Sequence, residues 1–156
     1  MYSPLPPYEI LQNKLIDFAT MQRLRRFARY WDLIGNSGNF VETTPLVWAG
    51  GGSPFAEFLR LSDWLYEREG KHHGILLTRL MELVFSYLTT ERGQAPRDVA
   101  GVLWRDFQRG ERREFPPFLR PYLPAAEAAA LVGARGKIRT TRRQDRHRPT
   151  ADTGGR

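Results

Sequence analysis

Two pairs of side chains in the middle of the sequence have the types that acid–base or metal chemistry uses. Arg79 and Glu82 lie three residues apart in an apolar stretch, where burial could perturb the pKa of a catalytic carboxylate. The same spacing forms an ordinary i, i+3 ion pair, which is the interpretation we favour. His72 and His73 are adjacent, so on a helix they point about 100° apart and cannot share a metal as an i, i+4 pair does. A metal site in a loop stays the alternative to solvated or capping histidines.

Two further motifs could bind anions. Arginine combined with aromatic side chains suits phosphate or single-stranded nucleic acid, and one predicted helix carries Arg23, Arg25, Arg26, Arg29, Tyr30 and Trp31. Nearby acids nearly neutralise this stretch, so we favour a solvated or domain-facing surface. Gly50-Gly51-Gly52 leads into a helix N-terminus, where anions can bind, but matches no phosphate-loop pattern and is interpreted as a linker.

Composition removes several classes of protein. The 156 residues are enough for about one domain, and 41% of them are apolar, which argues against a wholly disordered chain. The chain has no cysteine, so it can form no disulfide, thiolate nucleophile or cysteine-ligated metal site of its own. No apolar run reaches the roughly 18–20 residues of a membrane span, and no signal-peptide pattern opens the sequence. We therefore expect a soluble cytoplasmic protein.

The charge is concentrated at one end of the chain. The net charge is +7, yet residues 1–133 contain 16 basic and 15 acidic residues, whereas residues 134–156 contain 8 and 2. This basic tail is expected to be disordered. Its candidate contacts to a polyanion are Arg139, Arg142, Arg143 and Arg146.

The sequence predicts an all-α fold, a small bundle of four to five helices with a proline-rich strap. Residues 1–14 are expected to form an extended linker, 15–133 the helical domain and 134–156 the tail. Helix starts are predicted at Asp17, at Ser53-Pro54 and at Pro96, and helix ends at Gly70 and Gly110. The first helix should end near residues 36–39, with Gly38 in a left-handed conformation.

Apolar spacing defines the faces of these helices. In the first helix the apolar stripe includes Phe27 and Trp31, and Tyr30 is expected to lie off it. A third helix over residues 75–91 is apolar on nearly all sides and is expected at the centre of the fold. Residues 115–124 contain four prolines and should pack across the bundle as an ordered strap. A short helix is expected over residues 125–132.

Four segments carry a resemblance to cobalamin-binding radical-SAM proteins. Residues 3–11 resemble the segment that leaves the catalytic barrel of those proteins, and residues 73–83 resemble a helix of the domain that follows. Residues 143–147 resemble an Arg-Gln-x-Arg-His run near the end of such chains. The most specific segment resembles the signature of the helical domain of unknown function: Arg26-Phe27-Ala28-Arg29-Tyr30-Trp31-Asp32-Leu33-Ile34-Gly35-Asn36-Ser37-Gly38-Asn39-Phe40.

The resemblance implies a detached or truncated C-terminal accessory domain. The parent protein would use S-adenosylmethionine, an iron–sulfur cluster and cobalamin, held by a radical-SAM barrel and a cobalamin-binding domain that would be its partners. No cofactor or metal residue is carried over to this chain, which has no cysteine, and the isolated chain is expected not to be an enzyme. Residues expected to face the barrel or its substrate are Tyr8, Arg29, Tyr30, Trp31, Asp32 and Asn36.

Two alternatives stay open at this point. A small helical nucleic-acid-binding protein would bind RNA or DNA through its basic tail, and deletion of residues 134–156 or added salt would weaken that binding. A non-functional fragment would expose apolar surface made for a missing partner and would aggregate or bind dyes.

Overall fold

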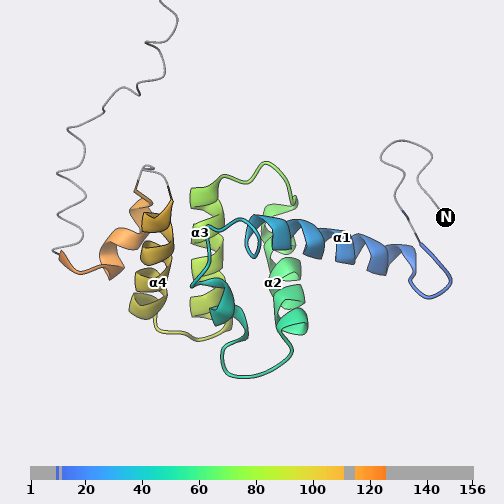
Figure 1. Cartoon of the computed structure of the whole chain (residues 1–156), viewed down its shortest axis with the longest axis horizontal. Helices are drawn as coiled ribbons and strands as arrows, with labels where there is room; N and C mark the ends of the chain where they lie inside the picture. Colours follow the sequence, from blue (N-terminus) through green and yellow to red (C-terminus); the bar gives the residue numbers. More distant parts are fainter. Residues whose placement is uncertain (1–9, 11, 111–114, 126–156) are drawn as a thin grey trace, which may run out of the picture. The chain divides into compact units, whose positions relative to one another are not determined.

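The computed structural model describes residues 10, 12–110 and 115–125. Every regular element among these residues is a helix, and the chain divides into the units Met1–Leu123 and Pro124–Arg156. All the elements lie in the first unit (Figure 1): α1 (Phe18–Leu33), η1 (Thr44–Trp48), α2 (Pro54–Glu69), α3 (Leu77–Ser86), η2 (Tyr87–Glu91), α4 (Pro96–Arg109) and η3 (Pro117–Tyr122). No helix of the described part is both long and apolar enough to cross a bilayer. Of the predicted helix at 125–132 only Ala125 is described, and the predicted boundary at 133 lies outside the described residues.

The predicted helix boundaries are confirmed at most positions. The Asp17 carboxylate accepts a hydrogen bond from the Thr20 N–H at 2.7 Å, and the Ser53 hydroxyl caps α2 just before Pro54. Gly70 ends α2 with a φ of 63°, a left-handed conformation that glycine adopts without steric cost. α4 begins at Pro96 and ends before Gly110, as the proline and glycine predict.

The first helix ends earlier than predicted, at Leu33 instead of near residues 36–39. The left-handed conformation predicted for Gly38 is confirmed by its φ of 74°, but Gly38 belongs to the turn that follows the helix. The indole of Trp31 packs against the backbone at Gly35, so close that a Cβ there would lie 2.8 Å from the ring. The Asn36 N–H donates to the Trp31 carbonyl at 3.0 Å, which turns the chain away from the helix axis before Gly38 is reached.

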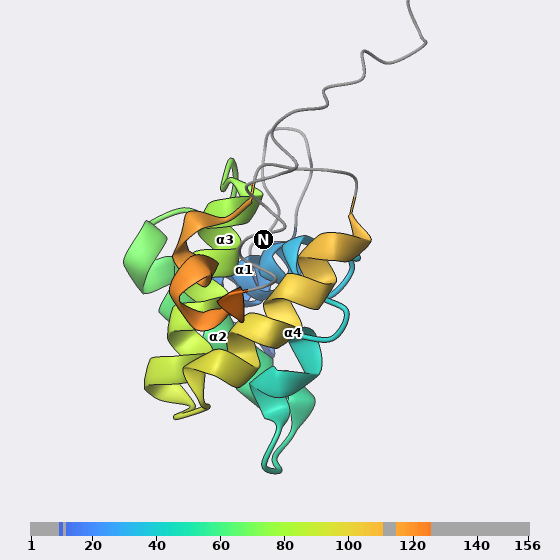
Figure 2. The same cartoon turned by 90° about the vertical axis from the view of Figure 1, so that its left-hand side faces the viewer.

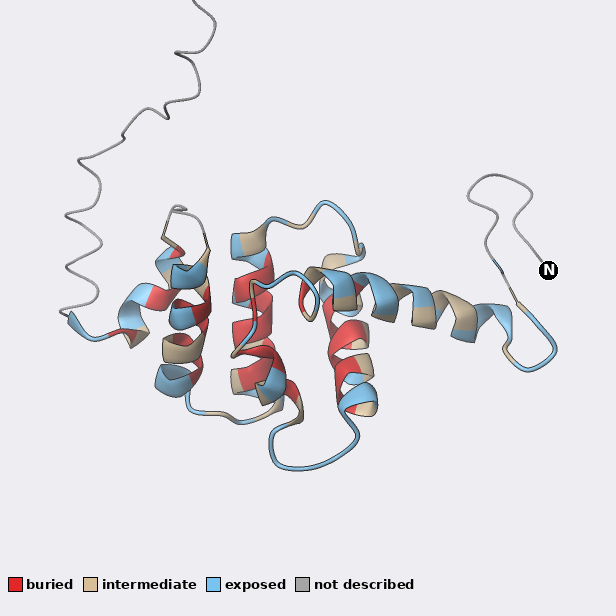
Figure 3. Cartoon of the chain, viewed as in Figure 1, coloured by how far each residue is buried: buried red, intermediate tan, exposed pale blue. Residues whose placement is uncertain are grey.

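The third predicted helix is present but changes geometry along its length. α3 covers residues 77–86, and η2 continues it as one turn of π-helix, in which the Arg92 N–H reaches the Tyr87 carbonyl at 3.2 Å. In Figure 1 α3 stands between α2 and α4, and most of its length is buried in Figure 3. The expectation that this apolar helix lies at the centre of the fold is confirmed.

The proline-rich segment packs on the bundle as predicted. Residues 117–122 form the 3-10 helix η3, beside α3 and α4 in Figure 2. The ring of Phe85 on α3 lies 5.6 Å from Phe118 and 4.9 Å from Tyr122 between centroids. Leu119 and Leu123 are buried. Aromatic and leucine side chains therefore hold a segment that its prolines keep from forming a long α-helix.

Candidate functional site

The predicted partner-facing residues lie mainly along the C-terminal half of α1. Arg29, Asp32 and Asn36 are exposed, and Trp31 is half-buried. The Asn36 amide donates to the Asp32 carboxylate at 3.1 Å. Tyr8 lies outside the described residues, as do the four tail arginines at 139, 142, 143 and 146.

Tyr30 is the exception, because its side chain is completely buried. The prediction that it lies off the apolar face is wrong: it stands three residues after Phe27 and four before Ile34, on the face that packs inward. Its hydroxyl donates to the Lys71 carbonyl at 2.7 Å, and burial raises the pKa of the hydroxyl to about 12. Tyr30 therefore fastens the loop after α2 against α1.

Replacing Tyr30 by phenylalanine should lower the free energy of unfolding by about 1 kcal/mol, because the Lys71 carbonyl loses its buried donor while the ring stays packed. Chemical denaturation followed by circular dichroism measures this. The matched control is Tyr122→Phe, because the hydroxyl of Tyr122 has no hydrogen bond within the described residues. Equal stability of the two variants would contradict the role given to the Tyr30 hydroxyl.

Aromatic rings join α1 to α2 directly beneath this surface. Phe58 is fully buried, and its ring meets Trp31 at 4.9 Å and Phe27 at 5.4 Å, both edge to face. Phe55, half exposed, adds a contact to Phe27 at 4.9 Å. Trp31 is thus an anchor on α2 as well as part of the outer surface.

Basic side chains of α1 meet the loop after α2 at one place. The Arg26 guanidinium lies over the Tyr66 ring, 4.4 Å from its centroid. The Tyr66 ring centroid lies 6.3 Å from that of His72, which in turn lies 5.6 Å from that of His73. We call this the arginine–histidine cluster: Arg25, Arg26, Arg29, Tyr66, His72 and His73.

The arginines of the arginine–histidine cluster influence the pKa of His72. Burial lowers the pKa of His72, and the positive charges of His73, Arg25, Arg26 and Arg29 lower it further. The Nδ1 of His72 and the Nε of Arg26 are buried without a hydrogen-bond partner among the described residues. No three potential metal ligands come together anywhere in the described part of the chain.

The Arg79–Glu82 pair and the glycine run at residues 50–52 both make contacts with neighbouring side chains of the domain. Arg79 pairs with Glu82 at 2.8 Å, as predicted, and also with Glu69 at 2.7 Å. At the N-terminus of α2, the Glu57 carboxylate lies so close to Gly52 that a Cβ there would be 3.1 Å from Oε1. A carboxylate already occupies that helix end, which disfavours the anion-binding alternative for the glycine run.

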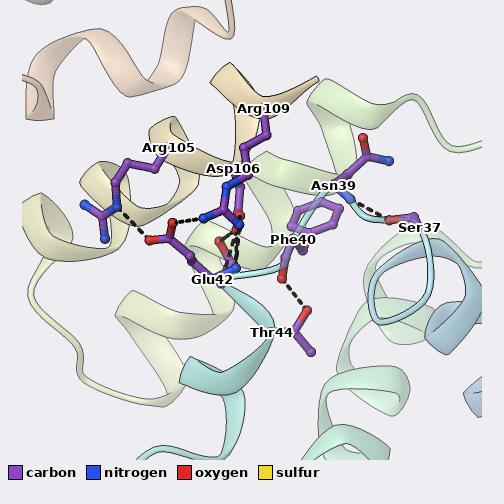
Figure 4. Close-up of polar contacts among 9 residues, drawn as sticks. Ser37, Asn39, Phe40, Glu42, Thr44, Arg105, Asp106 and Arg109 are labelled. Atoms are coloured by element: carbon purple, nitrogen blue, oxygen red, sulfur yellow. Dashed lines mark hydrogen bonds and ion pairs between the residues drawn. The ribbon is translucent and has the colours of Figure 1, made fainter. Parts of the chain in front are cut away.

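The sequence analysis did not predict one buried carboxylate that holds the connector after α1 in place. Asp106 on α4 is buried and accepts hydrogen bonds from the N–H groups of Glu42 and Thr43 and from the Thr43 hydroxyl, at 2.7–3.1 Å (Figure 4). The Glu42 carboxylate binds Arg105 at 2.7 Å and also pairs with Arg109. One feature of the sequence could have indicated its role: Asp106 lies three residues after Leu103, on the apolar face of α4, where an acid needs a buried partner.

The described residues form an all-helical domain. Most of its polar side chains described above make hydrogen bonds that stabilise the fold or form ion pairs on the surface. A family model described as "Protein of unknown function (DUF4080)" matches residues 1–131. The chain belongs to this DUF4080 family. Neither the curated proteins nor the solved structures include a match to it.

Proposed function

We propose that the chain is a non-catalytic accessory domain that packs on a larger catalytic protein. By the resemblance given above, that protein is a cobalamin-dependent radical-SAM enzyme, whose chemistry includes methyl transfer. By the same resemblance, the barrel and the cobalamin-binding domain would bind S-adenosylmethionine, the iron–sulfur cluster and cobalamin. This chain has no cysteine and so offers no thiolate ligand for the cluster. The location proposed for the assembly is the cytoplasm.

The exposed apolar beginning of α1 carries this proposal. Leu15 is 93% exposed and Phe18 50% exposed, and Ile10 just before them is 44% exposed. In Figure 3 the N-terminal half of α1 extends past α2 and is mostly exposed. Apolar side chains gathered at one exposed end of a domain are typical of a surface that another protein covers.

The position of these side chains in the sequence indicates which protein would cover them. Ile10 belongs to residues 3–11, the segment that resembles the exit from a radical-SAM barrel, and Leu15 and Phe18 follow shortly after it. A barrel joined to or assembled with this segment would lie next to Leu15 and Phe18. Arg29 and Asp32, further along the same helix, and Asn36, in the turn after it, would border the barrel's open end. Such a cover would keep water from radical intermediates.

The nucleotide sequence immediately upstream of this coding region identifies the partner to use. We expect it to encode a radical-SAM barrel, in frame or frameshifted. The barrel protein and this chain are then co-expressed and passed together over a size-exclusion column. Co-elution should be lost in the double variant Leu15→Asp, Phe18→Asp, because two charges would be buried in the interface.

The matched control is Leu76→Asp, a change at a 74% exposed apolar residue before α3, which should still co-elute with the barrel. Unchanged co-elution of the α1 double variant would contradict the proposal. Binding of S-adenosylmethionine or cobalamin by the isolated chain would contradict it as well.

A further inference from the structure

The arginine–histidine cluster gathers positive charge from two segments that are distant in sequence. Arg25, Arg26 and Arg29 are spaced so that they share one side of α1. The hydrogen bond from Tyr30 to the Lys71 carbonyl holds the loop with His72 and His73 against that helix. The fold therefore places three guanidinium groups around a histidine pair.

Two acids near the cluster form ion pairs with arginines outside it. Glu69, at the end of α2, accepts two hydrogen bonds from Arg79, at 2.9 and 2.7 Å. Asp63 accepts from Arg23 at 2.8 Å, which takes that arginine out of the cluster. Within the cluster, the Nε of Arg26 and the Nδ1 of His72 are buried and have no hydrogen-bond partner among the described residues.

We propose that the arginine–histidine cluster binds a phosphate group as a phosphomonoester or a nucleotide phosphate. Guanidinium groups bind phosphate oxygens in a bidentate manner, and stacking on Tyr66 fixes the plane of the Arg26 guanidinium beforehand. A phosphate also offers enough oxygen acceptors for two arginines and an imidazole at once. The Nε of Arg26 and the Nδ1 of His72 would find an acceptor after a small shift of their side chains.

The bound anion should change the protonation of His72. The groups that face His72 are Arg25, Arg26 and Arg29 from α1, Tyr66 from α2 and the adjacent His73. All the charged groups among them are basic and lower its pKa. A phosphate dianion would offset their charge and favour the imidazolium. Binding should therefore raise the pKa of His72, and at a pH between the pKa values of the free and the bound protein it should take up a proton.

The test uses the full chain at constant ionic strength, with inorganic phosphate and adenosine monophosphate as probes. NMR titration of the His72 imidazole should show a higher pKa with either probe than with chloride. Arg26→Ala and Arg29→Ala should each weaken binding at least about tenfold, the loss of one charge-assisted contact. Arg97→Ala, an exposed arginine of α4, is the matched control and should leave the affinity within about twofold.

A short single-stranded RNA distinguishes the two sources of the phosphate. Tighter binding of RNA than of adenosine monophosphate, lost in Arg26→Ala, assigns the site to a nucleic-acid backbone, and equal or weaker binding assigns it to a small phosphomonoester. Equal affinities of Arg26→Ala and Arg97→Ala for both phosphate probes, or an unchanged pKa of His72, would overturn the proposal. The chain alone is used, so the outcome is independent of docking to a barrel.

Discussion

Replacing Asp106 by alanine should lower the free energy of unfolding by about 3–5 kcal/mol. The buried carboxylate is the acceptor for two backbone N–H groups and one hydroxyl of the connector after α1, and alanine would leave all three donors unpaired (Figure 4). Because a domain of this size is stable by roughly 5–15 kcal/mol, the variant would lose a large share of its stability. Thermal denaturation should show a Tm lowered by on the order of 15 °C.

Gln108→Ala is the control for this measurement, since Gln108 is exposed on the same helix two residues further on. It should stay within about 0.5 kcal/mol of the original protein. Asp106→Asn keeps the shape of the side chain but replaces one acceptor oxygen by an NH₂ donor. That NH₂ group would face the N–H and hydroxyl donors of the connector, so we expect Asp106→Asn to lose most of the stability that Asp106→Ala loses. A drop below about 1 kcal/mol for Asp106→Ala would show that the connector does not depend on this carboxylate.

Truncation of Phe58 to alanine should also cost about 3–5 kcal/mol. The ring is fully buried between Phe27 and Trp31, and its loss would leave a cavity at the contact between α1 and α2. That contact positions the helix that carries both Phe18 and the three arginines of the arginine–histidine cluster. The variant should therefore unfold at lower denaturant concentration, as measured by urea titration with tryptophan fluorescence.

Phe55→Ala provides the same chemical change one turn earlier on α2. Its ring is 52% exposed and contacts Phe27, so the expected cost is about 1 kcal/mol. Both variants lose ring contacts, so the difference between their free energies of unfolding measures the effect of burying the ring. Similar losses for Phe55→Ala and Phe58→Ala would contradict the assignment of Phe58 to the core.

Local sequence signals predicted the helices well because each boundary depends on a residue's own chemistry. Asp17, Ser53 and Pro96 act within one turn of the chain, so their types were sufficient. Gly38 gave a false end to α1, because the packing of Trp31 on Gly35 turned the chain earlier. Tyr30 was misplaced because a tyrosine suits both a surface and an interior with a hydrogen-bond acceptor, and its acceptor, Lys71, lies 41 residues away.

The candidate site shows the same division. The arginines of α1 and the pair His72-His73 each stood out in the sequence, but nothing in their spacing placed them together. Their meeting depends on how α2 returns the chain to α1 and on the Tyr66 ring between them. Asp106 was missed for a related reason: its partners are backbone N–H groups, which every residue has and which no residue type reveals.

The π turn at η2 holds one residue more than an α-helical turn, so this domain should tolerate the loss of a single codon there. If Thr89 or Thr90 were deleted and α geometry restored, the Arg92 N–H would still reach the Tyr87 carbonyl, as an i to i+4 bond in place of the present i to i+5 bond. The chain after the turn would keep its direction. Glu91 would then still accept from the indole N–H of Trp64, now at 3.0 Å, and Arg92 would still bind Glu57, now at 2.9 Å.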